Sequence, residues 1–419
     1  MGRAVRNGAA SRQRIIRVIC SIRLYTGLAV DNPIEWRMLI SHISDLHLGY
    51  SQFSLEEREE DVYHTFNEAI DISIKERVKL VILAGDLFHN PRPCGKAIIT
   101  LGNMLKKLKE KQISTVFVLG EHDISRLRDI PFVHIYSNLG LAKKLRYDAP
   151  FIVENCALFG VDKERRSSVD SLIEKMHHAQ QLAKQHNGKK VLVLHQGLAD
   201  FNKFAGELNS TDLPKEFNYY ALGHYHEHYE KRFDFLGGPL AYPGSIDLTP
   251  SEGIKEVDKG FIVTDLSGEE PTTQWIRLEN RRPQFSARIN YKDIEYEVGM
   301  IVDKAIGYNK KPIARIEVAG NNIDSKVIAE HLKKLSDHCL HYVWQPLEDH
   351  LATTVYQSRP ADIDSELYRL SADALGSDEL AKFVIDEILP SAADKDAKSV
   401  LEILWQAYKL NKFRGYHQK

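Results

Sequence analysis

The sequence predicts an α/β or α+β protein with a layered core, and three observations lead to this class. Over residues 38–265, short apolar runs of strand length alternate with stretches whose apolar residues recur at helical spacing. Segments that alternate in this way build sheets covered by helices, with loops at the strand ends. The length of 419 residues and the 43% of hydrophobic residues also suffice for two or three domains with sizeable cores.

The apolar runs predict the order of elements in this first part of the chain. Buried strands are expected at 39–44, 80–83, 115–119, 157–161, 191–194 and 219–222. Helices are expected at 56–76 and 96–111, where the face opposite the apolar positions is charged. A turn-rich stretch at 266–271 then ends the pattern and marks a domain boundary.

A compact second unit is predicted after this boundary, followed by helices. Its expected elements are strands at 274–278, 284–291 and 313–318 and a helix at 324–338, and the C-terminal helices are expected at 366–389 and 395–410. The last helix carries an apolar stripe formed by Ala397, Val400, Leu401, Leu404, Trp405 and Tyr408. Two interpretations stay open: this stripe packs on the second domain, or it docks on a partner protein.

We therefore divide the chain into five segments. They are a basic N-terminal extension at 1–37, the main domain at 38–268, a small second domain at 269–345, a linker at 346–364 and C-terminal helices at 365–419. The first segment carries seven arginines against two acidic residues. It is either an extension without fixed structure or a mistaken start before Met38.

Charge and composition exclude several classes of protein. The net charge is -2, so any nucleic-acid binding must come from a local basic patch. No apolar stretch approaches the roughly 18 residues of a membrane span, and we expect no membrane partner. The four cysteines lie far apart without a Cys-x-x-Cys pair, which argues against a disulfide framework and predicts a reducing, intracellular setting.

Polar residues recur where predicted strands end, and these carry the chemistry. They are Asp45 and His47, Asp86 after Gly85, the run Glu121-His122-Asp123, His195, and the pair His224 and His226. Alternation along an extended segment would turn both members of each pair to one side, and loops from one sheet edge would share a cleft. Imidazoles and carboxylates without thiolates suit manganese, iron or zinc better than calcium. We expect two ions with Asp86 as the bridge, and hence phosphoester hydrolysis with His122 near the leaving oxygen.

The ordered set Asp-x-His, Gly-Asp, Gly-x-His-Asp, His and Gly-His-x-His resembles the calcineurin-like metallophosphoesterase superfamily over residues 38–265. More narrowly, the chain resembles the SbcD-like nuclease subunit of the DNA double-strand-break repair complex. The segments that carry this resemblance are Ser-Asp-Leu-His-Leu-Gly-Tyr at 44–50, Arg-Glu-Glu-Asp-Val-Tyr at 58–63, Ala-Gly-Asp-Leu-Phe-His at 84–89 with Arg-Pro at 92–93, His-Gln-Gly at 195–197, Tyr-Ala-Leu-Gly-His at 220–224 and Tyr-Pro-Gly-Ser at 242–245.

This resemblance implies a ligand set and an architecture. It implies a first metal held by Asp45, His47, Asp86 and His226, a second held by Asp86, the Glu121 position, His195 and His224, and catalytic roles for His122 and His89. It further implies two manganese ions per subunit, with iron or zinc as alternatives. The implied fold is a two-sheet sandwich with a DNA-contacting α/β cap domain, C-terminal helices that bind a coiled-coil, SMC-like ABC ATPase, and a homodimeric assembly.

Glu121 departs from the family pattern, which usually has asparagine before the catalytic histidine. A carboxylate there would tighten metal binding and lower turnover, because it reduces the positive charge that acts on the phosphate. The alternative is that Glu121 turns away and water fills its place. Contacts to double-stranded and single-stranded DNA are expected from Arg92, Lys96, Arg126 and Arg128, for which solvated charge is the alternative.

The sequence is compatible with three functions. The first is a metal-dependent DNA exonuclease and endonuclease that works at double-strand breaks with an ATPase partner, in the cytoplasm at the nucleoid or in the nucleus of a eukaryote. The second is a small-molecule or cyclic-nucleotide phosphodiesterase of the same superfamily. The third is a scaffold that binds DNA ends while its own site is weak, an option that Glu121 keeps open.

Overall fold

The computed structural model describes residues 37–125, 130–203 and 205–347, and in the C-terminal region 368, 370–372, 375, 377–389 and 397–409. Most of the N-terminal extension and of the predicted linker lies outside these residues. Among the helices described, none combines the length and the apolar character that crossing a membrane requires.

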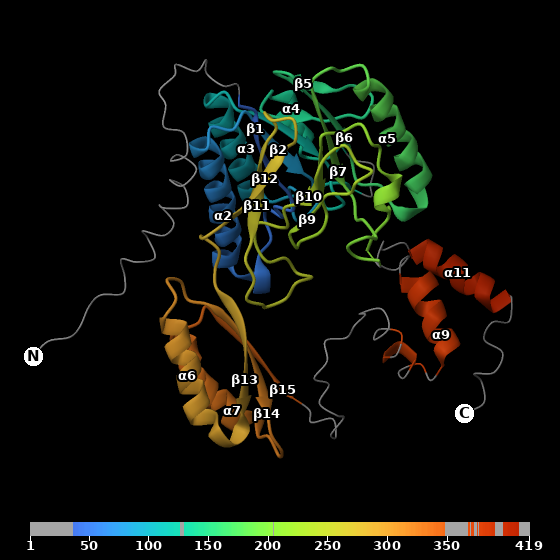
Figure 1. Cartoon of the computed structure of the whole chain (residues 1–419). Coiled ribbons are helices and arrows are strands. Elements are labelled where there is room, and N and C mark those ends of the chain that lie inside the picture. The colour runs from blue at the N-terminus through green and yellow to red at the C-terminus, as the bar shows by residue number, and fades with distance from the viewer. Residues whose placement is uncertain are drawn as a thin grey trace, which may run out of the picture. The chain divides into compact units, whose positions relative to one another are not determined.

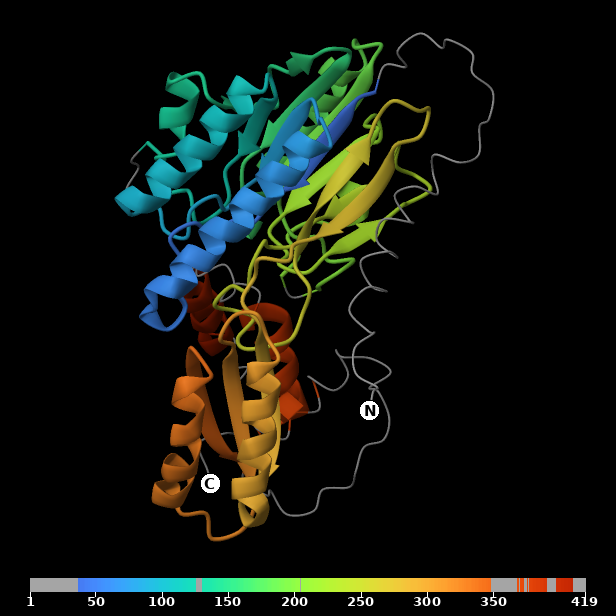
Figure 2. The same cartoon turned by 90° about the vertical axis from the view of Figure 1, so that its left-hand side faces the viewer.

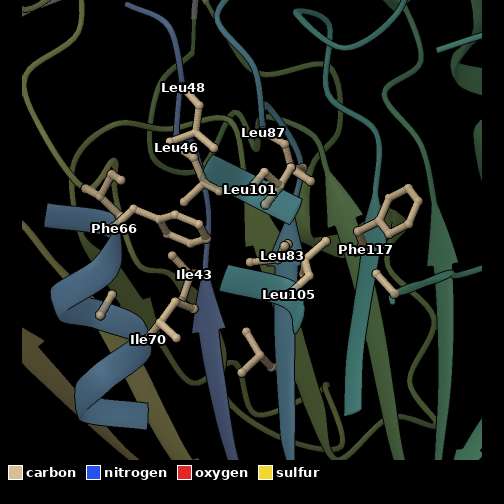
Figure 3. Packing of buried hydrophobic residues seen from close by; sticks show 14 of the residues in the cluster. Ile43, Leu46, Leu48, Phe66, Ile70, Leu83, Leu87, Leu101, Leu105 and Phe117 are labelled. Carbon is tan, nitrogen blue, oxygen red and sulfur yellow. The ribbon is translucent and has the colours of Figure 1, made fainter. Parts of the chain in front are cut away.

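The first sheet has the order β12-β11-β1-β2-β3-β4, and its strands β1 to β4 run parallel. Their bounds are β1 Leu39–Ile43, β2 Leu80–Ala84, β3 Ser114–Val118, β4 Lys143–Lys144, β11 Gly260–Asp265 and β12 Thr272–Arg277. Helices α2 (Glu56–Lys75), α3 (Gly95–Glu110) and α4 (His134–Asn138) cover one face of this sheet (Figures 1 and 2). Phe66, Ile70, Leu101 and Leu105 of α2 and α3 pack there against Ile43 and Leu83 of the strands (Figure 3).

The second sheet has the order β5-β6-β7-β8-β10-β9. Its strands are β5 Phe151–Val153, β6 Cys156–Val161, β7 Lys189–His195, β8 Tyr219–Gly223, β9 Tyr229–Lys231 and β10 Leu240–Tyr242. Helix α5 (Val169–Ala183) packs on its outer face through residues such as Leu172 and Met176. The inner faces of both sheets share a core that includes Ile82, Val116 and Val193, so the predicted two-sheet sandwich with flanking helices is confirmed.

A smaller sheet of parallel strands, β13-β14-β15, follows along the chain. We call residues 284–347, which contain this sheet and its helices, the cap unit. Its elements are β13 Gln284–Asn290, α6 Ile294–Ile306, β14 Ile313–Ala319, α7 Ser325–Leu332 and β15 His341–Leu347. The helices bury Val298, Ile328 and Leu332 against the sheet. The boundary predicted at residue 268 is too early, because β12 pairs along its whole length with β11 of the first sheet.

The C-terminal region contains α9 (Asp378–Phe383), a π-helical turn at Val384–Ile388 and α11 (Ala397–Lys409). Three members of the predicted apolar stripe on α11 are exposed, with Leu401 at 66%, Leu404 at 40% and Trp405 at 56% of their full accessibility. These three side chains therefore do not pack on the second domain.

Candidate active site

The polar residues predicted from the sequence lie at the carboxyl ends of β1, β2, β3, β7 and β8. Four of them adopt a left-handed backbone: Asp45 (φ 52°), His47 (φ 44°), Asp86 (φ 50°) and His224 (φ 103°). Positive φ is uncommon outside glycine and is typical of functional sites that the surrounding structure holds in place. The side chains therefore converge because tight turns bring them together. The sequence had suggested an extended segment, in which alternate side chains point to the same side.

Two glycines make this convergence possible. Gly85 has φ 91°, and a Cβ atom there would collide with the ring of His195. A Cβ atom at Gly120 would collide with the carboxylate and the amide of Asp86. Because only glycine lets the neighbouring loops approach this closely, the Gly-Asp and Gly-x-His-Asp patterns have a direct steric basis.

The first cluster contains Asp45, His47 and His226, which can each offer one ligand atom within 4.8 Å of the others. The Nε2 atoms of His47 and His226 lie 3.3 Å apart, and Nε2 of His226 lies 3.9 Å from Oδ1 of Asp45. Asp45 and His47 are buried. These three side chains therefore aim their donor atoms at one point.

The second cluster contains Glu121, His195 and His224, within the same limit of 4.8 Å. Glu121 reaches both histidines, because its two oxygens lie 3.0 Å from Nε2 of His195 and 3.0 Å from Nδ1 of His224. The structure therefore favours an inward-facing Glu121 over one that turns away. Asp86 stands between the clusters, with Oδ2 3.5 Å from Nε2 of His195 and 3.8 Å from Nε2 of His47.

The protonation states of the clustered histidines and carboxylates favour the binding of cations. Burial lowers the pKa of His47 well below its ordinary value and also lowers the pKa of His226, so both present neutral imidazoles. Burial and Glu121 oppose the ionisation of Asp86, yet His195 and His47 lower its pKa to about 2. His195 has a raised pKa despite its burial, because Asp86 and Glu121 favour its charged form. A divalent cation would take over the role of that proton.

The donor set fits the metals predicted from the sequence. Imidazole nitrogens and carboxylate oxygens, without thiolates, are the ligands of manganese, iron and zinc sites. Nδ1 of His195 lies 2.7 Å from the carbonyl oxygen of Ala84, which can only accept, so Nδ1 carries the proton and Nε2 faces the carboxylates. This contact orients His195 in the way that supporting hydrogen bonds orient metal ligands.

Further supporting residues were not found from the sequence. Thr249 Oγ1 lies 2.7 Å from Nδ1 of His226. Lys163 forms a buried ion pair with Glu207, and the Lys163 Nζ atom lies 3.3 Å from Nε2 of His224. These residues occur in no recognisable spacing relative to the histidines that they hold, so only the fold brings them together.

His122 and His89 lie side by side next to the first cluster. Their rings are stacked with centroids 5.5 Å apart, and the ring of His122 is 4.8 Å from that of His47. Nδ1 of His122 lies 2.8 Å from the carbonyl oxygen of His89, so Nδ1 must be the protonated nitrogen. Asp123, which follows His122, accepts hydrogen bonds from the amides of Leu87, Phe88 and Gly120 and so holds this loop.

The structure describes two of the four residues that are expected to contact DNA. Arg92 and Lys96 are exposed near the start of α3, and Lys96 forms ion pairs with Glu60 and Glu56 of α2. Arg126 and Arg128 lie outside the described residues. His228 lies outside both clusters; it is exposed and stacks on Trp275 with centroids 5.4 Å apart.

Comparison with known proteins defines the class first. A family model described as calcineurin-like phosphoesterase matches residues 38–228, which contain all the clustered side chains. The fold and the site thus define a metal-dependent phosphodiesterase. The resemblance to this superfamily is confirmed.

The comparison also identifies the family within this class. The chain is 33% identical over 405 residues to the DNA double-strand break repair protein Mre11 of Sulfolobus acidocaldarius, with 91% of this chain and 100% of that protein covered. It is 34% identical over 313 residues to the protein of the same name from Saccharolobus solfataricus, with 72% and 81% covered. The chain therefore belongs to the Mre11 family of DNA double-strand break repair proteins.

Proposed function

We propose that this chain is a manganese-dependent DNA exonuclease and endonuclease that hydrolyses phosphodiester bonds at double-strand breaks. The convergence of Asp45, His47, Asp86, Glu121, His195, His224 and His226 beside His122 carries this proposal. In it, Asp45, His47 and His226 hold one ion, Glu121, His195 and His224 hold the other, and Asp86 joins them. Ions bound here would activate water and neutralise the charge of the scissile phosphate.

His122 acts on the leaving oxygen in this proposal. Its Nδ1 proton is engaged by the carbonyl oxygen of His89, so Nε2 is the nitrogen that exchanges a proton. The backbone amide of His122 donates to Oδ1 of Asp86 at 2.9 Å, which ties its loop to the centre of the site. His89 stacks on His122, limits its rotation and faces the same phosphate.

A partner ATPase of the SMC-like, coiled-coil type binds the C-terminal helices in this proposal. The exposed side chains Leu401, Leu404 and Trp405 support it, because an apolar face of this kind is stabilised by a partner. The protein acts where DNA is, in the cytoplasm at the nucleoid or in the nucleus of a eukaryote. Double-stranded and single-stranded DNA are its substrates.

A homodimer is also part of the proposal. Helices α3 and α4 are in contact through the hydroxyl of Tyr136, which donates to the carbonyl oxygen of Ile98 at 2.7 Å. Large apolar side chains are exposed on these helices and on the segments just before and just after α4: Ile99, Ile130, Phe132, Ile135 and Leu139. A second copy of the chain would bury this patch.

A second candidate function is a DNA-end scaffold with weak catalysis. Glu121 favours it, because its carboxylate adds negative charge beside Asp86 and weakens the attraction for a phosphate. The scaffold would bind DNA ends in manganese without cutting them. A small-molecule phosphodiesterase, the remaining alternative, would act on chromogenic diesters far better than on DNA.

The test is cleavage of end-labelled DNA by the purified protein in manganese, with the His122→Ser variant and a chelator as controls. We expect cleavage by the native chain and none by the variant. Binding without cleavage would favour the scaffold. A clear preference for a chromogenic diester would favour the small-molecule enzyme.

A further inference from the structure

Arg58, on the first turn of α2, is the largest of the fully buried side chains and carries a charge. Its guanidinium donates to Oδ2 of Asp61 at 2.8 Å and to both oxygens of Asp247 at 2.9 and 3.3 Å. Its Nε donates to Oε1 of Gln52 at 3.0 Å. A buried charge is tolerated only when hydrogen-bond partners of opposite charge or polarity surround it. Gln52, Asp61 and Asp247 are these partners, and Arg58 in turn holds the three side chains in place.

One side of this group reaches the cap unit. Asp61 also accepts from Nε of Arg282 at 2.6 Å and from Nζ of Lys310 at 3.1 Å. Gln52 exchanges two amide hydrogen bonds with Gln284, the first residue of β13, at 3.1 and 2.7 Å. Two of the residues that Arg58 binds, Asp61 and Gln52, thus contact the cap unit and Arg282 in the segment just before it. Other contacts, such as Phe53 with His341 and Lys304 with Glu256, do not involve Arg58 or its partners.

The other side reaches the first metal cluster. Asp247 belongs to the segment 244–249, where the amide of Ser245 donates to the carbonyl oxygen of His226 at 3.1 Å. Two residues after Asp247, Thr249 contacts Nδ1 of His226. Ser44, which precedes Asp45, donates to the carbonyl oxygen of Gly244 at 3.3 Å. The segment that Arg58 holds through Asp247 thus holds the histidine in turn.

We propose that Arg58 is a positioning residue that couples the seating of the cap unit to the geometry of the first metal site. Arg58 binds Asp61, which in turn binds Arg282 and Lys310 at the cap unit. Arg58 also binds Asp247, which belongs to the segment that orients His226. Because coupling between two sites is reciprocal, metal bound at the first site stabilises the seated cap, and a seated cap tightens metal binding. A DNA backbone that contacts the cap would thereby favour the loaded site. This inference rests on the proposed metal site.

Arg282→Gln tests the coupling without touching a metal ligand or Arg58. It removes the two hydrogen bonds from Arg282 to Asp61 but leaves Lys310 and Arg58 bound to that carboxylate, so we expect the fold to be retained. We expect the dissociation constant of manganese at the first site, measured by titration calorimetry, to rise about fivefold, at the lower end of typical couplings. Arg146→Gln is the control, because Arg146 is exposed and pairs only locally with Asp148.

A second pair of measurements makes the result independent of folding. Manganese should slow hydrogen exchange in 284–347 of the native chain, and Arg282→Gln should remove most of that effect. Arg58→Lys should behave like Arg282→Gln, because an ammonium cannot bind two carboxylates with the geometry of a guanidinium. The coupling would be overturned if Arg282→Gln bound manganese as tightly as the native chain. It would also be overturned if manganese did not change the hydrogen-exchange rates of residues 284–347. If the native chain binds no manganese, the proposed function itself fails.

Discussion

Glu121 has a carboxylate where the family pattern usually has asparagine, and its two oxygens lie 3.0 Å from nitrogens of His195 and His224. His224 lowers the pKa of Glu121 well below its ordinary value even though burial opposes ionisation. The carboxylate is therefore ionised and adds to the charge of Asp45 and Asp86. This extra charge favours cations and disfavours a phosphate in the same place.

Glu121→Asn should change metal binding and turnover in opposite directions. Removing one negative charge should weaken manganese binding at the second cluster by about tenfold, because such a charge is worth roughly 1–2 kcal/mol at short range in a partly buried site. The maximal cleavage rate at saturating manganese should rise. Titration calorimetry and a saturating-metal rate measurement check both parts, and an unchanged affinity would show that Glu121 is not a ligand.

At the residue scale, the sequence predicts the clustered side chains but not their supports. Asp45, His47 and His224 stand in short patterns with fixed spacing, and such patterns are visible in one sequence. Thr249 and Glu207 reach the histidines from loops with no characteristic spacing. Arg58 lies in a segment that carries the resemblance, but its ion pair with Asp247, 189 residues further along the chain, is visible only in the fold.

Strand β1 carries an unusual buried histidine between the two sheets. His42 is fully buried, its Nδ1 lies 2.9 Å from the hydroxyl of Tyr219 on β8, and burial lowers its pKa to about 3. The unfolded chain takes up a proton at this residue near pH 6.5, whereas the folded chain does not until about pH 3. The stability that this difference contributes is complete above pH 6.5 and is lost as the pH falls towards 3.

His42→Asn should therefore flatten the acid side of the stability profile. Between pH 6 and 4 the native histidine should cost about 1.4 kcal/mol of unfolding free energy per pH unit, and asparagine, which cannot titrate, should remove that slope. Urea unfolding at several pH values measures the difference. Parallel profiles for both proteins would mean that His42 is not excluded from protonation in the fold.

At the scale of elements, buried parallel strands were the most predictable parts. β2 and β8, and the centres of β3 and β7, are apolar runs because both faces of their sheets are covered. β15 was not predicted, because its sequence His-Tyr-Val-Trp-Gln-Pro-Leu is half-buried and contains a proline. The domain boundary was misplaced because β12 follows a turn-rich stretch and alternates exposed with half-buried residues, so its pairing with β11 cannot be read from its sequence.

For the whole molecule, the apolar patch on α3 and α4 predicts dimerisation. Ile99→Asp combined with Ile135→Asp should convert the protein to a monomer, because two charges would be buried in the interface without partners. Sedimentation velocity measures the mass, with Ile152→Asp on the exposed edge strand β5 as the control. A dimer that persists in the double variant would place the interface elsewhere.

The exposed face of α11 makes a separate prediction for partner binding. Replacing Leu401, Leu404 and Trp405 by serine should abolish capture of an SMC-like ATPase, because the apolar area that drives docking is lost. Manganese binding should be unaffected in the same variant. Binding of the ATPase at native strength would show that these side chains are not its docking surface.

If the clustered side chains hold two metal ions, the manganese content of the protein after equilibrium dialysis will show it. The native chain and His122→Ser should each retain two ions per chain. His226→Ala and His224→Ala should each retain one, because these residues belong to different clusters. A single ion in the native chain, or a loss of both ions in His122→Ser, would contradict the account.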